Sequence, residues 1–176
     1  MTEPIVPVPA SNGSAAPSRR AVDLEVVGLS KEYPLLFRKV DGAHNPPEKL
    51  EVLRGIGFVV KAGDRVAIVG KSGAGKSTLL HLLGALDTPT RGQILFGGTN
   101  IATWGGWQLA RFRNLNLGFI FQFHHLLPEF TAEENVAMPG WIGRMQSGQA
   151  LKKAGGLLAE LGLTPRARHF PNQLSG

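Results

Sequence analysis

Apolar and polar residues alternate in the first part of the chain that has a regular pattern. The stretch VDLEVVGLSKEY places Val22, Leu24 and Val26 on one face of an extended chain, and this period of two predicts a β-strand with one buried face. The stretch LEVLRGIGFVVKAGD, residues 50–64, predicts a second strand that ends in a Gly-Asp turn. The stretch QILFGG, residues 93–98, predicts a short third strand.

Two other stretches are apolar almost without interruption. They are RVAIVG, residues 65–70, and GFIFQF, residues 118–123. A continuous apolar run of this length is typical of a strand that is covered on both faces in a parallel sheet. We therefore expect both to be buried strands of a central α/β core.

Helical patterns follow each of these two stretches. The sequence LLHLLGALD after the first one has leucines 79, 80, 83 and 86 at helical spacing. Thr131 and Glu134 have the spacing of a capping box, in which the side chain of each residue binds the backbone N–H of the other, and predict the start of a second helix. Leucines and alanines with the same periodicity predict another helix over roughly 149–161.

The composition describes an ordinary globular protein. Among 176 residues, 43% are hydrophobic and 18% are charged, and the absence of cysteine excludes disulfides and thiolate metal sites. No stretch approaches the roughly 20 apolar residues that span a bilayer. Residues 1–20 are rich in Pro, Ala, Ser and Gly and do not have the order of a signal peptide. We expect a disordered tail over 1–20, one folded domain over 21–176, and a cytoplasmic location.

The net charge of +6 adds little to this description. A basic protein can bind nucleic acid or an anionic membrane when its Lys and Arg side chains are concentrated in one place. Here the basic residues are scattered and form no dense run. We therefore expect a solvated surface and no nucleic-acid partner.

One segment carries recognisable chemistry, the sequence GKSGAGKST at residues 70–78. It matches the phosphate-binding pattern G-x-x-x-x-G-K-[ST], lies after an apolar run and precedes a helical pattern. Its glycines let successive backbone N–H groups point at phosphate oxygens, and the helix that follows adds its positive end. In this pattern Lys76 reaches the β- and γ-phosphates and the Ser77 hydroxyl binds Mg²⁺. The predicted cofactor-binding residues of this loop are Gly70, Lys71, Ser72, Gly73, Ala74, Gly75, Lys76, Ser77 and Thr78.

Three further features narrow the class of phosphate-binding protein. The chain has no N-K-x-D motif, which a GTPase would use to recognise guanine. Tyr33 lies 37 residues before Gly70 at the end of a predicted strand, and Gln122 lies 46 residues after Lys76 at the end of another. The chain then ends in Leu174-Ser175-Gly176.

In this order, the aromatic residue, the phosphate loop, the glutamine and the L-S-G sequence resemble the ATP-binding subunits of ABC transporters. Within that family, the block GFIFQFHHLLPEFTAEENVAMP is similar to the LolD type, which serves a lipoprotein-releasing complex. The resemblance implies an α/β P-loop fold with an N-terminal antiparallel β subdomain and a partial helical subdomain. It also identifies Leu174-Ser175-Gly176 as the start of the LSGGQ signature. We therefore expect the C-terminal part of the core to be missing and the chain to be inactive by itself.

The resemblance also implies roles for individual residues. Tyr33 would stack on the adenine of ATP, residues 70–78 would hold its triphosphate, and Ser77 and Gln122 would bind Mg²⁺. Gln122 would also contact the attacking water, which makes it the predicted catalytic residue.

The partners implied are a second copy of the ATPase subunit and transmembrane permease subunits of the LolC/LolE kind. The expected location is the cytoplasmic face of the inner membrane, and the expected function is the release of lipoproteins driven by ATP hydrolysis. The alternatives are an ATPase of the macrolide-exporter (MacB) or cell-division (FtsE) kind, and a nucleotide-binding fragment that does not hydrolyse ATP.

Overall fold

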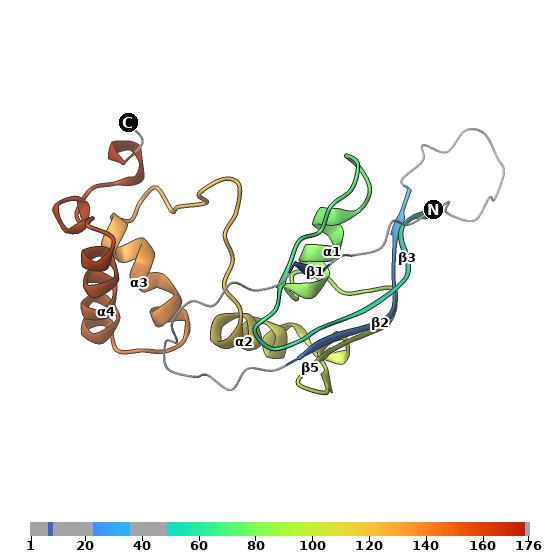
Figure 1. Ribbon diagram of the computed structural model, residues 1–176. Coiled ribbons are helices and arrows are strands. Elements are labelled where there is room, and N and C mark those ends of the chain that lie inside the picture. The colour runs from blue at the N-terminus through green and yellow to red at the C-terminus, as the bar shows by residue number, and fades with distance from the viewer. Residues whose placement is uncertain (1–6, 9–22, 36–48, 175–176) are drawn as a thin grey trace, which may run out of the picture. The chain divides into compact units, whose positions relative to one another are not determined.

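The computed structural model describes residues 7–8, 23–35 and 49–174, and it divides into two compact units, residues 1–109 and 110–176 (Figure 1). The strands of the first unit are β1 (Pro7–Val8), β2 (Leu24–Pro34), β3 (Lys49–Val60), β4 (Arg65–Val66), β5 (Arg91–Phe96) and β6 (Thr99–Asn100). Its helices are α1 (Lys76–Leu83) and the single turn η1 (Ile101–Thr103). Helix α2 (Gly106–Asn116) spans the boundary between the units.

The antiparallel sheet of the first unit has the strand order β3-β2-β5-β6. Its register places Val26 of β2 opposite Ile94 of β5, and Tyr33 opposite Leu50 of β3. The inward-facing side chains of Val26, Leu29 and Ile94 are almost completely buried. The predictions of the strands at 22–33, 50–64 and 93–98 are thus confirmed for the residues that the structure describes, because each strand has a hydrogen-bonded neighbour.

The two predicted buried strands of the central core are wrong. Of residues 65–70 only Arg65 and Val66 form a strand, which pairs antiparallel with β1, and Val69 is 71% exposed. Residues 118–123 form no strand, and the side chain of Ile120 is fully exposed. A strand is stable only when a neighbour satisfies its backbone N–H and C=O groups. Among the described residues, no parallel strand pairs with either segment.

The second unit is helical. Its elements after α2 are α3 (Ala132–Ile142), α4 (Ser147–Glu160), η2 (Thr164–Arg166) and η3 (Pro171–Gln173). Helices α3 and α4 lie side by side (Figure 1), and the small side chains of Ala137, Ala150 and Ala154 form their buried contact. The predicted capping box is confirmed, since the N–H of Glu134 donates to Thr131 Oγ1 and the Thr131 N–H donates to the Glu134 carboxylate.

The predicted disordered tail at 1–20 lies outside the described residues except for Pro7 and Val8, which form a strand instead. Residues 175–176 of the predicted signature start also lie outside them. In the ranges that the structure does describe, no helix has the length and apolar character needed to cross a bilayer. The boundary predicted at residue 20 stays a prediction.

Candidate functional site: the phosphate-binding loop and its surroundings

The loop between β4 and α1 bends sharply at two glycines. Gly73 has a φ of 78° and Gly75 a φ of 86°, values in the left-handed region that residues with a Cβ rarely adopt. Gly75 is also the residue that immediately precedes α1. The chain can therefore turn from the loop into the helix within one residue.

Close contact with β3 also restricts position 75 to glycine. A Cβ at this position would lie 2.8 Å from the Leu53 Cδ2 atom and 3.1 Å from the Val52 carbonyl oxygen. Both distances are shorter than ordinary packing contacts, so any larger residue would push the loop away from β3. Strand β3 therefore supports the loop from the side of the protein core.

Lys76 closes the loop from inside. Its Nζ atom donates hydrogen bonds to the carbonyl oxygens of Gly70 at 2.9 Å and Lys71 at 2.7 Å. The ammonium group is thus held beside the turn that the first residues of the loop make, at the start of α1. This arrangement holds a positive charge in the loop at the start of α1, and the role of Lys76 in binding phosphate stays a prediction.

The first turn of α1 offers backbone donors to an anion. The α1 N-terminus has no side-chain cap and no acidic residue in its first turn, and the first intrahelical bond at this end runs from the Leu79 N–H to the Gly75 oxygen at 2.9 Å. The N–H groups of Lys76, Ser77 and Thr78 come before that bond, where a helix leaves its donors without partners. A phosphate chain fits this set of N–H groups, one ammonium and the exposed Ser77 hydroxyl.

Tyr33 lies in the same unit as the loop. It is half-buried near the end of β2, opposite Leu50 of β3, and β3 contacts Gly75 only a few residues further along. Its hydroxyl donates to Asp87 Oδ2 at 2.9 Å, and the Lys31 ammonium lies over its ring, 4.8 Å from the centroid. Sequence reasoning identified Tyr33 but missed Lys31 and Asp87, since neither belongs to a recognisable motif.

Asp87 is charged at neutral pH. Burial raises the pKa of its carboxyl group, but hydrogen bonds from Lys31, from the Thr88 N–H and from Tyr33 outweigh this effect and hold the pKa below its usual value. The ionised form is therefore the one that the surrounding donors stabilise.

Gln122 lies in the second unit, in the segment between α2 and α3 that forms no regular structure. Its side chain is exposed, and the two aromatic residues beside it, Phe121 and Phe123, are exposed as well. The roles of Gln122 near Mg²⁺ and the attacking water stay predictions, as does the assignment of Ser77 to Mg²⁺.

Several known proteins are similar to this chain in sequence. The chain is 48% identical over 153 residues to the lipoprotein-releasing system ATP-binding protein LolD of Geobacter metallireducens, a match that covers 87% of this chain and 64% of that protein. It is 51% identical over 148 residues to the LolD of Idiomarina loihiensis, covering 84% of this chain and 60% of that protein. The chain thus spans about three-fifths of the length of these relatives.

Solved structures show the same fold. A dimeric post-hydrolysis state of the ATP-binding cassette MJ0796, bound to ADP and Pi, superposes with a TM-score of 0.71 at 31% identity and covers 86% of this chain and 63% of that chain. A second dimeric structure of MJ0796, described as a bacterial ABC transporter cassette, superposes with a TM-score of 0.72 at 32% identity, covering 87% of this chain and 63% of that one. The predicted ABC ATPase fold is therefore confirmed.

The family model for the ABC transporter matches residues 53–176, which is well over half of the chain. The match begins in β3, at the residue that contacts Gly75, and includes the whole phosphate-binding loop. The chain belongs to the ABC transporter family.

Proposed function

We propose that this chain is the ATP-binding subunit of an ABC transporter that releases lipoproteins from the inner membrane. The observation that carries the proposal is the loop at 70–78, which is closed by Lys76, supported by β3 and followed by an uncapped helix N-terminus. The identity of about 50% to several LolD proteins supports this type of transporter over the MacB and FtsE kinds.

In this proposal the residues of the chain share the work of binding. The N–H groups of the loop and of the first turn of α1 bind the triphosphate, and Lys76 neutralises charge on its terminal oxygens. Tyr33 stacks on the adenine. Ser77 and Gln122 hold Mg²⁺, which when bound would neutralise charge on the β- and γ-phosphate oxygens.

The proposed assembly has two ATPase subunits on two permease subunits of the LolC/LolE kind. Dimeric structures of MJ0796 support the pairing of ATPase subunits. The subunit would lie at the cytoplasmic face of the inner membrane without crossing it. Gln122 would link the nucleotide to the permease and orient the attacking water, so it acts in coupling rather than in affinity.

Nucleotide binding can be tested first. Titration of the full chain with a fluorescent ATP analogue and Mg²⁺ should give saturable binding, and Lys76→Ala should abolish it because it removes the ammonium group that the loop holds at the start of α1. Lys152→Ala is a matched control, since the Lys152 side chain is exposed on α4, outside the phosphate-binding loop. Equal binding by the unaltered chain and Lys76→Ala would contradict the proposal.

The type of transporter needs a separate experiment. Residues 1–176 would replace the matching part of a LolD relative, and lipoprotein release from membranes that contain its permease would be measured. We expect release that depends on ATP and is lost in Lys76→Ala. If the chimera bound ATP but supported no release, nucleotide binding would stand and the lipoprotein assignment would fail.

A further inference from the structure

The end of β2 is joined to the loop after α1 by a group of charged and polar side chains outside the phosphate-binding loop. The Lys31 Nζ atom donates to Asp87 Oδ1 and to the Thr88 carbonyl oxygen, both at 2.7 Å. The Tyr33 hydroxyl donates to the other carboxylate oxygen, Asp87 Oδ2, at 2.9 Å. Asp87 thus binds two side chains of β2 at once, one through each oxygen.

The burial of Lys31 shows that this group is more than a surface ion pair. Its exposed fraction is only 9%, although lysine is rarely buried unless it is paired. A buried ammonium that lost its carboxylate would leave an uncompensated charge in the protein. By comparison, the pair Lys61–Asp23 is formed by side chains that are 67% and 47% exposed, where an ion pair has little effect.

The same contacts restrict the Tyr33 ring. The Lys31 ammonium lies over one of its faces and attracts it through a cation–π interaction, and the bond to Asp87 fixes the direction of the hydroxyl. Because a ring has two faces and Lys31 lies over one, a nucleotide base can stack only on the other. Lys31 thus occupies one face of the ring, and a base that stacks on Tyr33 would use the other.

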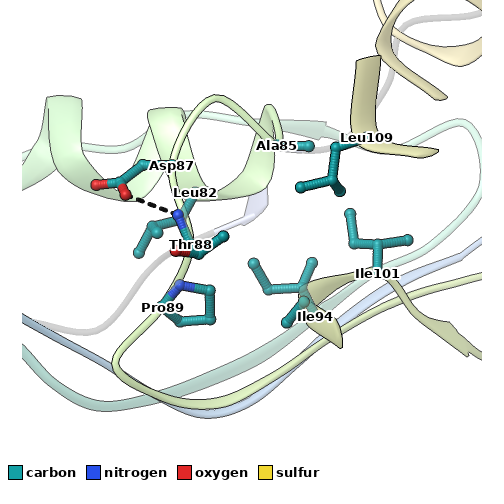
Figure 2. Close-up of a pocket in the computed structure, with 9 residues that line it drawn as sticks. Leu82, Ala85, Asp87, Thr88, Pro89, Ile94, Ile101 and Leu109 are labelled. Atoms are coloured by element: carbon teal, nitrogen blue, oxygen red, sulfur yellow. Dashed lines mark hydrogen bonds between the residues drawn. The ribbon is translucent and has the colours of Figure 1, made fainter. Parts of the chain in front are cut away.

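Asp87 is fastened to the helix that begins in the phosphate-binding loop. The N–H groups of Leu86 and Asp87 donate to the His81 carbonyl oxygen of α1 at 2.8 and 3.3 Å. Figure 2 shows Asp87 beside the apolar residues between α1 and β5, with its hydrogen bond from the Thr88 N–H and its carboxylate directed away from Ile94 and Ile101. Tyr33 is therefore tied to the far end of the helix whose first residue, Lys76, closes the loop.

Two further hydrogen bonds hold the loop after α1 against β2. The Thr90 N–H donates to the Ser30 carbonyl oxygen, and the Glu32 N–H donates to Thr90 Oγ1, both at 2.9 Å. Opposite Tyr33, β3 leads from Leu50 to the residues that contact Gly75. The ring is thus connected to the loop along two routes, one through α1 and one through β3.

We propose that Asp87 and Lys31 are positioning residues, which hold the Tyr33 ring as a one-sided platform for the purine base of the nucleotide at a set distance from the phosphate-binding loop. This inference rests on the proposed function, in which Tyr33 receives adenine. The new element is that an aromatic ring at position 33 is not sufficient. Affinity for the base also depends on the hydrogen bond from the Tyr33 hydroxyl to Asp87.

Two ligands separate the base from the phosphates in the test. Calorimetric titrations of the full chain would use Mg-ATP and inorganic tripolyphosphate, which has no base. Tyr33→Phe keeps the ring but removes the hydroxyl, and we expect its ATP affinity to fall roughly three- to tenfold with tripolyphosphate unchanged. Asp87→Asn should show the same selective loss, because its one carboxamide oxygen cannot replace the two oxygens that accept from Lys31 and Tyr33. The two substitutions together should lose little more than either one, because each removes one partner of the same bond.

Two control variants and a folding measurement separate the positioning role from other causes of weaker binding. Asp23→Asn changes a carboxylate of the exposed pair with Lys61 and should leave both ligands unaffected. Tyr33→Ala removes the platform itself and should lose at least as much ATP affinity as Tyr33→Phe. Thermal melting of each variant would be recorded, and if Asp87→Asn did not fold, Tyr33→Phe would decide alone.

The outcomes distinguish this inference from the proposed function. Unchanged ATP binding by Tyr33→Phe, with a loss in Tyr33→Ala, would overturn the positioning role and leave adenine stacking intact. Equal losses for ATP and tripolyphosphate would show a merely structural role and also overturn it. If Tyr33→Ala bound ATP normally, adenine stacking itself would fail, and with it the positioning role.

Discussion

Two short apolar segments of this protein each contain an isoleucine, and the two isoleucines differ completely in burial. Ile94, in the ILF sequence of β5, is 1% exposed, whereas Ile120, in the FIF sequence at 119–121, is fully exposed. Strand β5 has hydrogen-bonded partners on both sides, β2 and β6. Around Ile120 the aromatic side chains contact each other instead, with Phe119 and Phe121 stacked at 5.4 Å between ring centroids.

This difference shows what an apolar pattern can and cannot specify. The pattern states that a segment can be buried, but the backbone becomes a strand only where another strand accepts and donates its hydrogen bonds. Strand β5 finds β2 within the same unit. For residues 118–123 no such neighbour exists in the part of the chain that the structure describes.

The candidate site shows the same contrast. The phosphate-binding loop is made of consecutive residues that use their own backbone, so its shape needs only α1 and the contact with β3. The predicted role of Gln122 depends on a strand that would hold it at a particular place. The shape of the phosphate-binding loop therefore depends on local structure, whereas the predicted role of Gln122 depends on a strand paired within a sheet.

The largest effect that tests this comparison is expected from matched isoleucine substitutions. Ile94→Ala should lower the free energy of unfolding by about 2–5 kcal/mol because it leaves a cavity in a closed core. Ile120→Ala should change it by less than about 0.5 kcal/mol, since its side chain is already in solvent. Urea denaturation followed by circular dichroism measures both, and equal losses would show that residues 118–123 are buried after all.

A second pair of substitutions compares a glycine of the phosphate-binding loop, Gly75, with a glycine of the segment at 118–123, Gly118. Gly75→Ala should cost about 1–3 kcal/mol of stability and should weaken ATP binding, because its Cβ would collide with Leu53 and its φ of 86° disfavours alanine. Gly118→Ala should be tolerated, since no atom lies within 4 Å of its Cβ position. Melting curves and nucleotide titrations would be compared, and normal ATP binding by a folded Gly75→Ala would contradict the geometry of the loop.

The charge of Asp87, in the first unit, makes a smaller and pH-dependent contribution to the free energy of unfolding. Its pKa in the folded protein is below its usual value, so its ion pair contributes fully to stability above the unfolded-state pKa of about 3.9. That contribution is lost as the pH falls through the folded-state pKa. At pH 7, Asp87→Asn should lower the free energy of unfolding by about 1–2 kcal/mol.

Below about pH 4, the stability of Asp87→Asn should fall less steeply than that of the unaltered chain, because one of the titrating groups is absent. Urea midpoints recorded over a pH series would measure both curves. Parallel curves across the acid range would mean that the Asp87 carboxylate adds nothing to stability.

The smallest effect on affinity is expected at Gln122. In a version of the chain extended to the full length of a LolD relative, Gln122→Ala should change Mg-ATP affinity by less than about twofold, because the loop and Tyr33 supply the main contacts. Stimulation of ATP hydrolysis by the permease subunits should fall. A variant that lost ATP binding but kept normal stimulation would show that Gln122 belongs with the binding residues instead.

The sequence by itself determined the elements whose causes are local. The alternating pattern from Val22 onward predicted β2, the spacing of Thr131 and Glu134 predicted the start of α3, and the GKSGAGKST pattern predicted the loop that Lys76 closes. Each of these predictions rests on residues close together in the chain, since period, capping and glycine conformation can be read over a few residues.

The tertiary structure alone decided the features that depend on distant residues. Asp87 and Lys31 are 56 positions apart, and no motif links them, yet the antiparallel register and the loop after α1 bring them to 2.7 Å. Leu53 of β3 leaves no room for a Cβ at position 75 in the loop, so a glycine is needed there. The exposure of Ile120 likewise follows from which strands find partners, because backbone hydrogen bonds between strands are satisfied only in three dimensions.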